Sequence, residues 1–168
     1  MKFELASAED LSRIVEIYNQ AVLTRQSTAD LKPATVQQRQ PWFAAHQNNR
    51  QRPLWIIKNT DTVVGWMSLS DFYGRPAYQR TAEISLYLDQ NYQGHGVGKQ
   101  ALTFLADQLT ACQVEIVLAF VFSHNKASQH LFRTFGYQRW GHLPEVALLD
   151  QRLCDLDILG KDYRQNNI

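Results

Sequence analysis

The turn that decides the fold reads Gln93-Gly94-His95-Gly96-Val97-Gly98-Lys99. It follows a segment of alternating apolar residues, Thr81 to Asp89, and precedes apolar residues at helical spacing over about 97–111. A glycine-rich turn between a strand and a helix exposes backbone N–H groups at the start of the helix, where the helix dipole favours an anion. The turn therefore predicts a phosphate-binding cradle.

Two widespread phosphate-binding motifs do not fit this turn. A Walker loop needs a glycine five positions before Gly98, where Gln93 stands, and a serine or threonine after Lys99, where Gln100 stands. The dinucleotide fingerprint G-x-G-x-x-G also fails, because Lys99 occupies the place of its third glycine. What remains is the pattern Gln/Arg-x-x-Gly-x-Gly, for which a plain turn at a helix start is the alternative interpretation.

Hydrophobic periodicity predicts a chain of mixed helices and strands around this turn. Helices are expected at about 8–22, from about Thr35 through Ala45, at about 97–111 and from about Asn125 onward. Strands are expected at Phe3–Leu5, Leu54–Lys58, Val63–Ser70, Thr81–Asp89, Val114–Phe122, Tyr137–His142 and Arg152–Gly160. In the strand before the turn, Glu83, Ser85 and Tyr87 alternate with apolar residues and so share one side.

Length and charge exclude several classes of protein. The 168 residues predict one domain over residues 1–168, and 17 basic against 16 acidic residues give a net charge of +1. Nucleic-acid and membrane-surface binders rely on excess positive charge, so neither partner is expected. The longest apolar run, Ile116 to Phe122, is far shorter than the roughly 20 residues of a membrane-spanning helix.

The remaining compositional signals concern location and metals. The N-terminal residues show no secretory signal pattern, so the cytoplasm is the expected location. Cys112 and Cys154 are isolated in sequence, which is typical of buried reduced thiols. Because the histidines and cysteines show no ligand spacing, no metal is expected.

Several further blocks occur together with the glycine turn. They are Ile17-Tyr18-Asn19, Phe72 to Tyr78, Thr81 to Leu88, Asn125-Lys126-Ala127-Ser128, Leu131 to Tyr137, and Asp155 to Gly160. In order and spacing these blocks resemble the GNAT superfamily of N-acetyltransferases, and within it the phosphinothricin acetyltransferase branch. The resemblance covers nearly the whole chain.

The resemblance implies an α/β (α+β) architecture, the GNAT fold. This is a mixed, mostly antiparallel sheet of about seven strands with helices on both faces. Acetyl-coenzyme A (acetyl-CoA) would lie in a cleft where two neighbouring central strands splay apart. Members of the branch are commonly homodimers, so a homodimer is expected. The apolar residues of the late strands could supply its interface: Val146, Leu148, Leu149, Leu153 and Leu156.

Carried over residue by residue, the resemblance assigns the cofactor contacts. Leu86, Tyr87 and Leu88 would offer backbone hydrogen bonds to the pantetheine arm, and the turn from Gln93 to Lys99 would hold the pyrophosphate through its main-chain N–H groups. Asn125 would bind the far side of the pantetheine, with Ser128 near the nucleotide end. A helix cap is an equally good and compatible interpretation of Asn125.

The chemistry follows from what an amine needs in order to attack a thioester. An alkyl amine is mostly protonated at neutral pH, so a base must remove a proton directly or through water. Glu83 occupies the family's acidic strand position and is the candidate base, with an exposed strand carboxylate as the alternative interpretation. Many members protonate the departing thiolate with a tyrosine, but the matching position here is Phe132. Water could suffice, or Tyr87, Tyr137 or His130 could substitute.

Substrate choice is expected from the loop after the second hairpin strand. Arg75 can form a bidentate pair with a carboxylate or phosphinate, although a solvated loop charge is the alternative interpretation. Tyr73, Glu83 and Ser85 are the other expected acceptor contacts. The resemblance implies, as acceptor, the amine of a small amino acid or of a toxic analogue such as phosphinothricin, methionine sulfone or methionine sulfoximine. Thr28, Asp30 and Asp155 lie in segments that resemble family regions near the acceptor.

Two other functions stay open at this point. The chain could be an acyl-CoA binding or sensing module that has lost turnover, an interpretation that Phe132 favours. It could also acetylate a protein N-terminus or lysine, which would require an open peptide groove.

Overall fold

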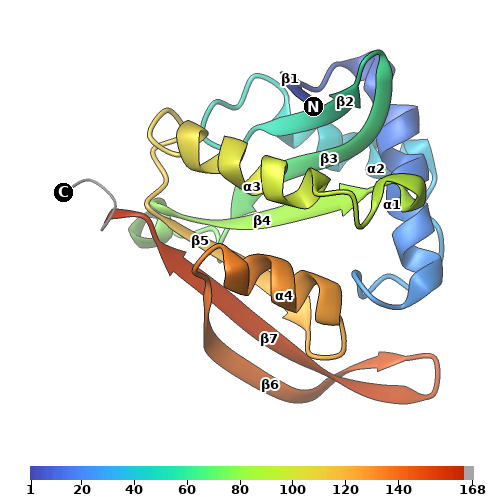
Figure 1. The fold of residues 1–168 in the computed structure, drawn as a ribbon, viewed down its shortest axis with the longest axis vertical. Helices are drawn as coiled ribbons and strands as arrows, with labels where there is room; N and C mark the ends of the chain where they lie inside the picture. Colours follow the sequence, from blue (N-terminus) through green and yellow to red (C-terminus); the bar gives the residue numbers. More distant parts are fainter. Residues whose placement is uncertain (165–168) are drawn as a thin grey trace.

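Seven strands form one sheet, in the order β1-β2-β3-β4-β5-β7-β6 (Figure 1), in a computed structural model that describes residues 1–164. Every neighbouring pair is antiparallel except β4 and β5, which are parallel. The strands are β1 (Lys2–Leu5), β2 (Leu54–Asn59), β3 (Thr62–Asp71), β4 (Thr81–Leu88), β5 (Ile116–Phe122), β6 (Gln138–Leu149) and β7 (Arg152–Asp162). The predicted mixed, mostly antiparallel sheet is confirmed.

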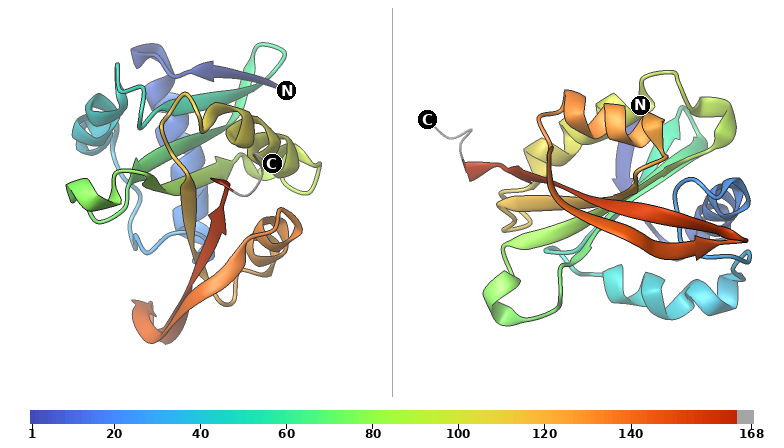
Figure 2. Two further views of the ribbon diagram at one scale, coloured as in Figure 1. Left: turned by 90° about the vertical axis from the view of Figure 1, so that its left-hand side faces the viewer. Right: turned by 90° about the horizontal axis from the view of Figure 1, so that it is seen from below.

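Helices cover both faces of this sheet, as predicted (Figure 2). They are α1 (Leu11–Thr24), α2 (Val36–His46), α3 (Val97–Gln108) and α4 (Lys126–Thr134), with short 3-10 turns η1 (Ala8–Asp10), η2 (Pro76–Tyr78) and η3 (Gln90–Tyr92). One face packs α1 and α2 over Leu54, Ile56 and Trp66, and the other packs α3 over Met67, Ala82 and Ile84. The two faces of β4 therefore meet different layers.

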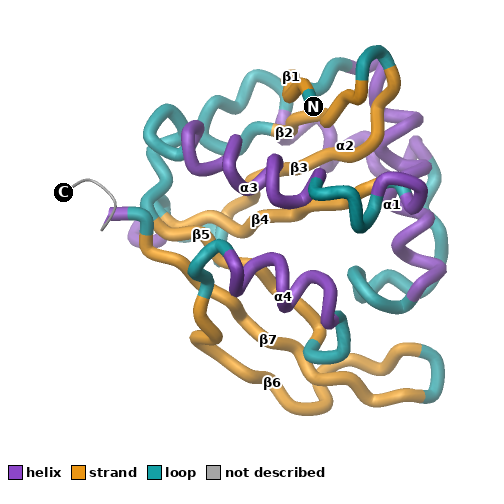
Figure 3. Tube along the Cα trace, viewed as in Figure 1, coloured by secondary structure: helices purple, strands orange, loops and turns teal. Residues whose placement is uncertain are grey.

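The central strands β4 and β5 separate after a short parallel ladder. Thr81, Ala82 and Glu83 pair with residues 116–118, and no pairing between the two strands is found beyond that point within residues 1–164. Figure 3 shows the two strands diverging toward the ends that carry α3 and α4. From Ile84 to Leu88, β4 is consequently paired with β3 on one edge only.

Local sequence signals explain where the first two helices begin. The Asp10 carboxylate accepts hydrogen bonds from the Ser7 amide at 2.8 Å and the Ser7 hydroxyl at 2.9 Å, so the chain turns through η1 into α1. Thr35 caps α2, because its hydroxyl accepts the amide of Gln38 while the Gln38 side chain accepts the amide of Thr35. Pro41 lies inside α2 without ending it.

The sequence-based boundary of the first late strand is wrong. The prediction ended it at His142, whereas β6 continues to Leu149 through irregular pairing between Leu143 and Ala147. Pro144 and Glu145, which has a positive φ of 52°, lie in this irregular stretch and resemble a turn in sequence. Because β6 is at the edge of the sheet, a proline and a bulge cost it few ladder bonds. None of the helices in the described chain is long and apolar enough to span a membrane.

Candidate active site

The glycine turn presents backbone donors at the start of α3. Gly94 and Gly96 have φ angles of +76° and +81°, a conformation that L side chains rarely adopt. Gly96 caps α3 without a side chain, so the first amides of the helix, at Val97, Gly98 and Lys99, have no intrahelical acceptor. A Cβ added at Gly94 or Gly96 would meet nothing within 4 Å, so the space before the turn is open. These features fit a phosphate-bearing ligand.

Gly98 has a different role from Gly94 and Gly96. A Cβ at this position would lie 2.9 Å from Cδ2 of Leu131, and the glycine has ordinary helical geometry. The residue therefore lets α3 approach α4, and its side-chain-free Cα is a packing feature. His95 and Lys99 are exposed on the turn.

A network of side chains fixes the end of β4 that leads into the turn. The Gln93 amide donates to the backbone oxygen of Leu88 at 3.1 Å. Arg13 and Gln20 of α1 donate to the buried Asp89 carboxylate at 2.7 and 3.1 Å. Burial alone would raise the pKa of Asp89, but hydrogen bonds from Gln20, the Asn91 amide and Arg13 outweigh it and lower the pKa.

Between Ile84 and Leu88, the edge of β4 that faces β5 is free to bind an extended ligand. Leu86 and Leu88 turn their half-buried side chains toward α3, and their edge facing β5 has no strand partner in residues 1–164. Such an edge can form strand-like hydrogen bonds with an extended chain. The predicted backbone contacts of Leu86, Tyr87 and Leu88 are therefore compatible with the geometry.

Asn125 caps α4 and also joins it to the loop between α1 and α2. Its side-chain oxygen accepts the Ser128 amide at 3.1 Å at the start of α4, and Nδ2 donates to the Gln26 oxygen at 3.1 Å and the Ser27 hydroxyl at 3.3 Å. The cap interpretation is thus correct. The role of Asn125 and Ser128 toward a cofactor stays a prediction, and Asn125 would exchange its loop contacts to fulfil it.

The opposite face of β4 carries the predicted acceptor residues. Glu83, Ser85 and Tyr87 share this face, on the side covered by α1 and α2. The Glu83 carboxylate forms no hydrogen bond or ion pair with the rest of the described chain, and its burial raises its pKa. A half-buried carboxyl with a raised pKa and no partner has the properties of a general base.

The strand β3 adds a polar group that the sequence did not indicate as functional. Ser68 lies opposite Ser85, and Ser70 lies opposite Glu83 in the antiparallel ladder. The Ser68 side chain is fully buried, and its hydroxyl has no hydrogen-bond partner in residues 1–164. A serine between Met67 and Leu69, on the same period as Trp66, was the available signal.

Two tyrosines connect this face to the loop between α1 and α2. The Tyr87 hydroxyl donates to the Ser27 oxygen at 3.1 Å. Tyr18, whose ring lies 5.2 Å from that of Tyr87, bonds through its hydroxyl to Thr28 and to the carboxylate of Asp30. Burial and the Asp30 hydrogen bond raise the pKa of Tyr18 to about 12. The loop therefore closes the face beside Tyr87, so Thr28 and Asp30 do lie near it.

Arg75 lies in an exposed loop at the Glu83 end of β4. The preceding strand ends with Asp71 opposite Ala82, so the loop begins next to the pair formed by Ser70 and Glu83. Arg75 lies 5.7 Å from the ring of Tyr73, which is itself 71% exposed and packs with Phe72 and Tyr78.

The base of this loop is held by an arginine that sequence reasoning missed. Arg52 is buried, and Nε donates to Asp71 at 2.6 Å while NH2 donates to the Gln79 oxygen at 2.8 Å. These bonds join the two ends of the segment that carries Arg75. The loop is exposed but anchored.

The candidates for the leaving-group acid differ in accessibility. Phe132 is buried and contacts Tyr137 edge-on, with ring centroids 5.0 Å apart. Tyr137 is 2% exposed, and its hydroxyl lies 3.1 Å from that of Tyr163. Burial raises the pKa of Tyr137 well above its usual value, and the hydroxyl does not reach an open surface. His130 is exposed on α4.

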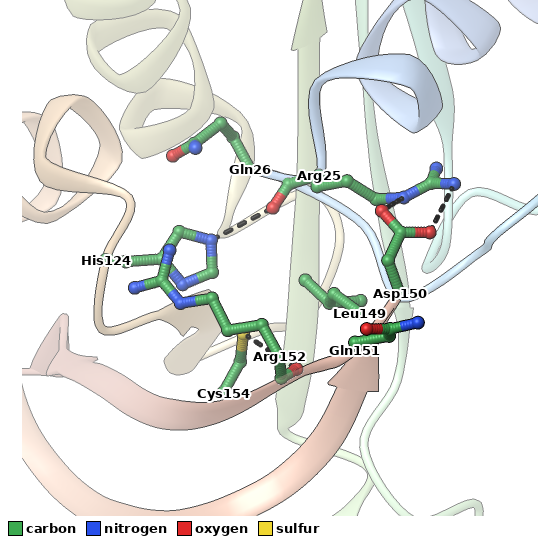
Figure 4. Close-up of a pocket in the computed structure, with 8 residues that line it drawn as sticks. All are labelled: Arg25, Gln26, His124, Leu149, Asp150, Gln151, Arg152 and Cys154. Carbon is green, nitrogen blue, oxygen red and sulfur yellow. Dashed lines mark hydrogen bonds and ion pairs between the residues drawn. The ribbon is translucent and has the colours of Figure 1, made fainter.

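A surface cavity of about 390 Å³ lies between the α1–α2 loop and the turn joining β6 to β7 (Figure 4). In it, His124 is 2.9 Å from the Arg25 oxygen, and Arg25 pairs with Asp150 at 3.1 Å. Its other lining residues include Leu149 and Cys154, which pack against Phe122 of β5. The cavity thus adjoins Asn125 at the open end of β5. Within the described residues, no group of three or more histidine, cysteine or acidic side chains could hold a metal.

Comparison of the sequence with known proteins identifies a single family. The model of the acetyltransferase (GNAT) family matches residues 14–137. A Bacillus subtilis (strain 168) protein named "Putative phosphinothricin acetyltransferase YwnH" is 39% identical, over 96% of this chain and 99% of its own. A Salmonella typhimurium L-methionine sulfoximine/L-methionine sulfone acetyltransferase is 28% identical, over 95% of this chain and 92% of its own.

Solved structures agree with this result. A phosphinothricin acetyltransferase from Sinorhizobium meliloti, solved in complex with acetyl-CoA, has a TM-score of 0.88 and 26% identity over 96% of this chain and 87% of that one. An N-acetyltransferase from Staphylococcus aureus Mu50 has a TM-score of 0.90 and 30% identity over 96% and 98%. The predicted superfamily and its fold are confirmed, and the chain belongs to the acetyltransferase (GNAT) family.

Proposed function

We propose that this chain, as one catalytic domain, transfers the acetyl group of acetyl-CoA to the amine of a small amino acid or a toxic analogue of one. The observation that carries the proposal is the two-sided geometry of β4. One edge leads, unpaired, into the glycine turn, and the face toward α1 and α2 carries the unpartnered carboxylate of Glu83. Both substrates can therefore approach the same strand at once.

The residues present define how the reaction would proceed. Acetyl-CoA supplies the acetyl group as a thioester. Glu83 takes a proton from the acceptor ammonium, directly or through a water on the polar face that includes Ser68 and Ser85. A backbone N–H on the free edge of β4 stabilises the negative charge that develops on the attacked carbonyl oxygen. Phe132 has no proton to give, Tyr137 is enclosed and the Tyr87 hydroxyl donates to the Ser27 oxygen, so the leaving thiolate takes its proton from water or from the exposed His130.

The substrate class is supported by the loop and by the relatives. Arg75 supplies a cation that forms no ion pair within residues 1–164, beside the aromatic cluster of Phe72, Tyr73 and Tyr78. Relatives at 28% identity are named for L-amino acids and for methionine sulfoximine and sulfone. An acidic group on a small amine suits such a loop.

The test is thiol release from acetyl-CoA with a panel of amines. The panel holds phosphinothricin, methionine sulfone, methionine sulfoximine, common amino acids, a polyamine and a short peptide. We expect saturable release with at least one small amino acid analogue and little with the polyamine or peptide. Turnover confined to the peptide would contradict the substrate class, and coenzyme binding without any turnover would favour the sensing module, to which Phe132 points.

We also propose that two copies pair through the hairpin of β6 and β7. Val146, Leu148 and Leu153 are more than half exposed on this hairpin, whereas Leu149 is buried and Leu156 packs beside it in a local core. The five late-strand residues therefore divide into a surface set and a core set. An exposed apolar patch of this kind suits a symmetric interface with a second copy.

Light scattering on the eluting protein tests this pairing. The wild type should have twice the mass of one chain, 19.4 kDa. Leu148→Asp should shift it toward the monomer, while Leu5→Asp, at a leucine 69% exposed on the opposite sheet edge, should not. A monomeric wild type would contradict the proposal.

We further propose a cytoplasmic location, which the two buried free thiols of Cys112 and Cys154 suit.

A further inference from the structure

Arg39 of α2 has an unusual environment for a half-buried arginine. Its guanidinium carbon lies 4.6 Å from the ring centroid of Tyr18 and 4.1 Å from that of Trp42. Nε is buried and has no hydrogen-bond partner in residues 1–164, and the guanidinium forms no ion pair with them. Two aromatic rings thus hold a cation that has no anion.

Other arginines with partly buried side chains are paired. Arg13 meets Glu16 and Asp89, Arg25 meets Asp150, and Arg52 meets Asp71. A cation removed from water without a counter-ion is costly, and stacking on aromatic rings recovers only part of the lost solvation. The stacking does fix the plane of the guanidinium, which leaves its terminal nitrogens oriented to bind a carboxylate at two points.

The position of Arg39 relates it to the acceptor face of β4. Tyr18, beneath the guanidinium, lies 5.2 Å from the ring of Tyr87. Trp42 lies 5.2 Å from Trp66, which in turn lies 4.8 Å from Tyr87. Tyr87 shares its strand face with Ser85 and Glu83. The aromatic sandwich therefore packs directly on the layer that carries the candidate base.

The nearby loop carboxylate does not neutralise Arg39. Asp30 accepts the hydroxyl of Tyr18 and forms no ion pair with the arginine. The acceptor face consequently holds one unpartnered carboxylate, Glu83, and one unpartnered guanidinium. An amino acid has the complementary pair of charges, an ammonium and a carboxylate.

We propose that Arg39 is a specificity-determining residue that binds the carboxylate of the amino acid acceptor while its amine is directed toward Glu83. This inference rests on the proposed function, and it assigns to α2 a role distinct from that of the exposed Arg75. The enzyme should then discriminate an amino acid from the corresponding amine without a carboxylate, and that discrimination should depend on Arg39.

The test compares methionine sulfone with 3-(methylsulfonyl)propylamine, which lacks only the carboxylate. Arg39→Met keeps an unbranched side chain between the two rings and removes the charge. We expect the KM for methionine sulfone to rise roughly 10- to 100-fold, as for loss of a charge-assisted hydrogen-bonded pair, with the KM for the amine unchanged. Arg50→Met, at an exposed arginine before β2, is the matched control and should change neither.

The remaining outcomes separate the possible failures. If wild type releases thiol with neither acceptor nor any other panel amine, the proposed function fails and the inference fails with it. If wild type is active and Arg39→Met leaves both KM values unchanged, or raises both equally, the inference alone is overturned. Acetyl-CoA affinity shows whether Arg39→Met folds. If it does not fold, Arg39→Lys is tested instead, because lysine keeps the positive charge but lacks the planar guanidinium that can bind a carboxylate at two points. A lysine variant whose methionine sulfone KM does not rise selectively would overturn the inference.

Discussion

The two sides of β4 are built on different principles. On the side of α3, the main features are backbone: a free strand edge, two glycines with positive φ and a helix start that has no side-chain cap. On the side of α1 and α2, they are side chains contributed by β3, β4, both helices and two loops. A backbone site is encoded in a short contiguous stretch, whereas a side-chain site exists only after distant segments have packed together.

The largest expected effect comes from changing the backbone side at Gly96. Valine at a φ of +81° costs on the order of 1–3 kcal/mol in strain, and its side chain would enter the open space before the turn. Gly96→Val should therefore abolish measurable acetyl-CoA binding in calorimetry. Gly74→Val is the control, because Gly74 has a φ of +64° and equally open surroundings but lies in the Arg75 loop. Normal binding by Gly96→Val would exclude the turn as the cofactor cradle.

The next largest effect concerns the acceptor side at Glu83. Glu83→Gln should lower kcat by roughly 10²- to 10⁴-fold, the usual contribution of a general base, and leave acetyl-CoA affinity unchanged. Since only the ionised carboxylate accepts a proton, wild-type kcat should fall as pH decreases through the raised pKa of Glu83. The kcat of Glu83→Gln should not show this fall at low pH. Equal kcat values for the variant and wild type at every pH would exclude Glu83 as the base.

The same substitution has a predicted effect on stability. A carboxyl group whose pKa is raised by folding favours the folded state below its unfolded pKa and loses that contribution as pH rises through the folded value. The glutamine variant has no such charge, so its Tm at neutral pH should equal or exceed that of wild type. A clear fall in Tm would indicate that Glu83 has a structural role instead.

The sequence predicts features that depend on neighbouring residues better than features that depend on the packing of distant segments. The glycine turn, the alternation in β4 and the hairpin of β2 and β3 all depend on neighbouring residues, and each is present in the structure. The end of β6 was mispredicted, because Pro144 and Glu145 resemble a turn unless the edge position of the strand is known.

Sequence reasoning missed several residues of the site for one physical reason, which is that their contacts come from distant parts of the chain. The bond between Arg13 and Asp89 joins positions 76 residues apart, and the contacts of Arg39 with Tyr18 and of Arg52 with Asp71 likewise depend on packing between separate elements. A lone arginine or serine in the sequence has no local pattern that reveals an unpaired, buried atom. Ser68 differs in sequence from its apolar neighbours, but the missing partners of its hydroxyl and of the buried Nε of Arg39 are visible only in the folded chain.

A smaller effect is expected at Arg75, which tests whether the exposed loop contributes to the acceptor side. Arg75→Ala should raise the KM for phosphinothricin by a factor of about 10, in the range of one charge-assisted contact, and change that for simple amines less. Steady-state thiol release with both acceptors measures the difference. An identical change in KM for phosphinothricin and for simple amines would mean that Arg75 does not bind the carboxylate or phosphinate.

The smallest effect is expected at Gly98, where the two glycine roles can be separated. Its added Cβ would meet only the end of a flexible leucine, and alanine favours a helix over glycine by about 1 kcal/mol. Gly98→Ala should thus change Tm and acetyl-CoA affinity little. A loss of affinity comparable to that of Gly96→Val would contradict the packing role assigned to Gly98.

The measurement that tests the two-sided account most directly is a two-substrate initial-rate study of thiol release. In this account acetyl-CoA on the α3 side of β4 and the acceptor on the α1 and α2 side are bound at the same time, and the amine attacks the thioester directly. Double-reciprocal lines should then intersect as the two concentrations are varied. The buried thiols of Cys112 and Cys154 would then take no part. Parallel lines, with thiol released before the acceptor binds, would show a covalent acetyl-enzyme and contradict the account.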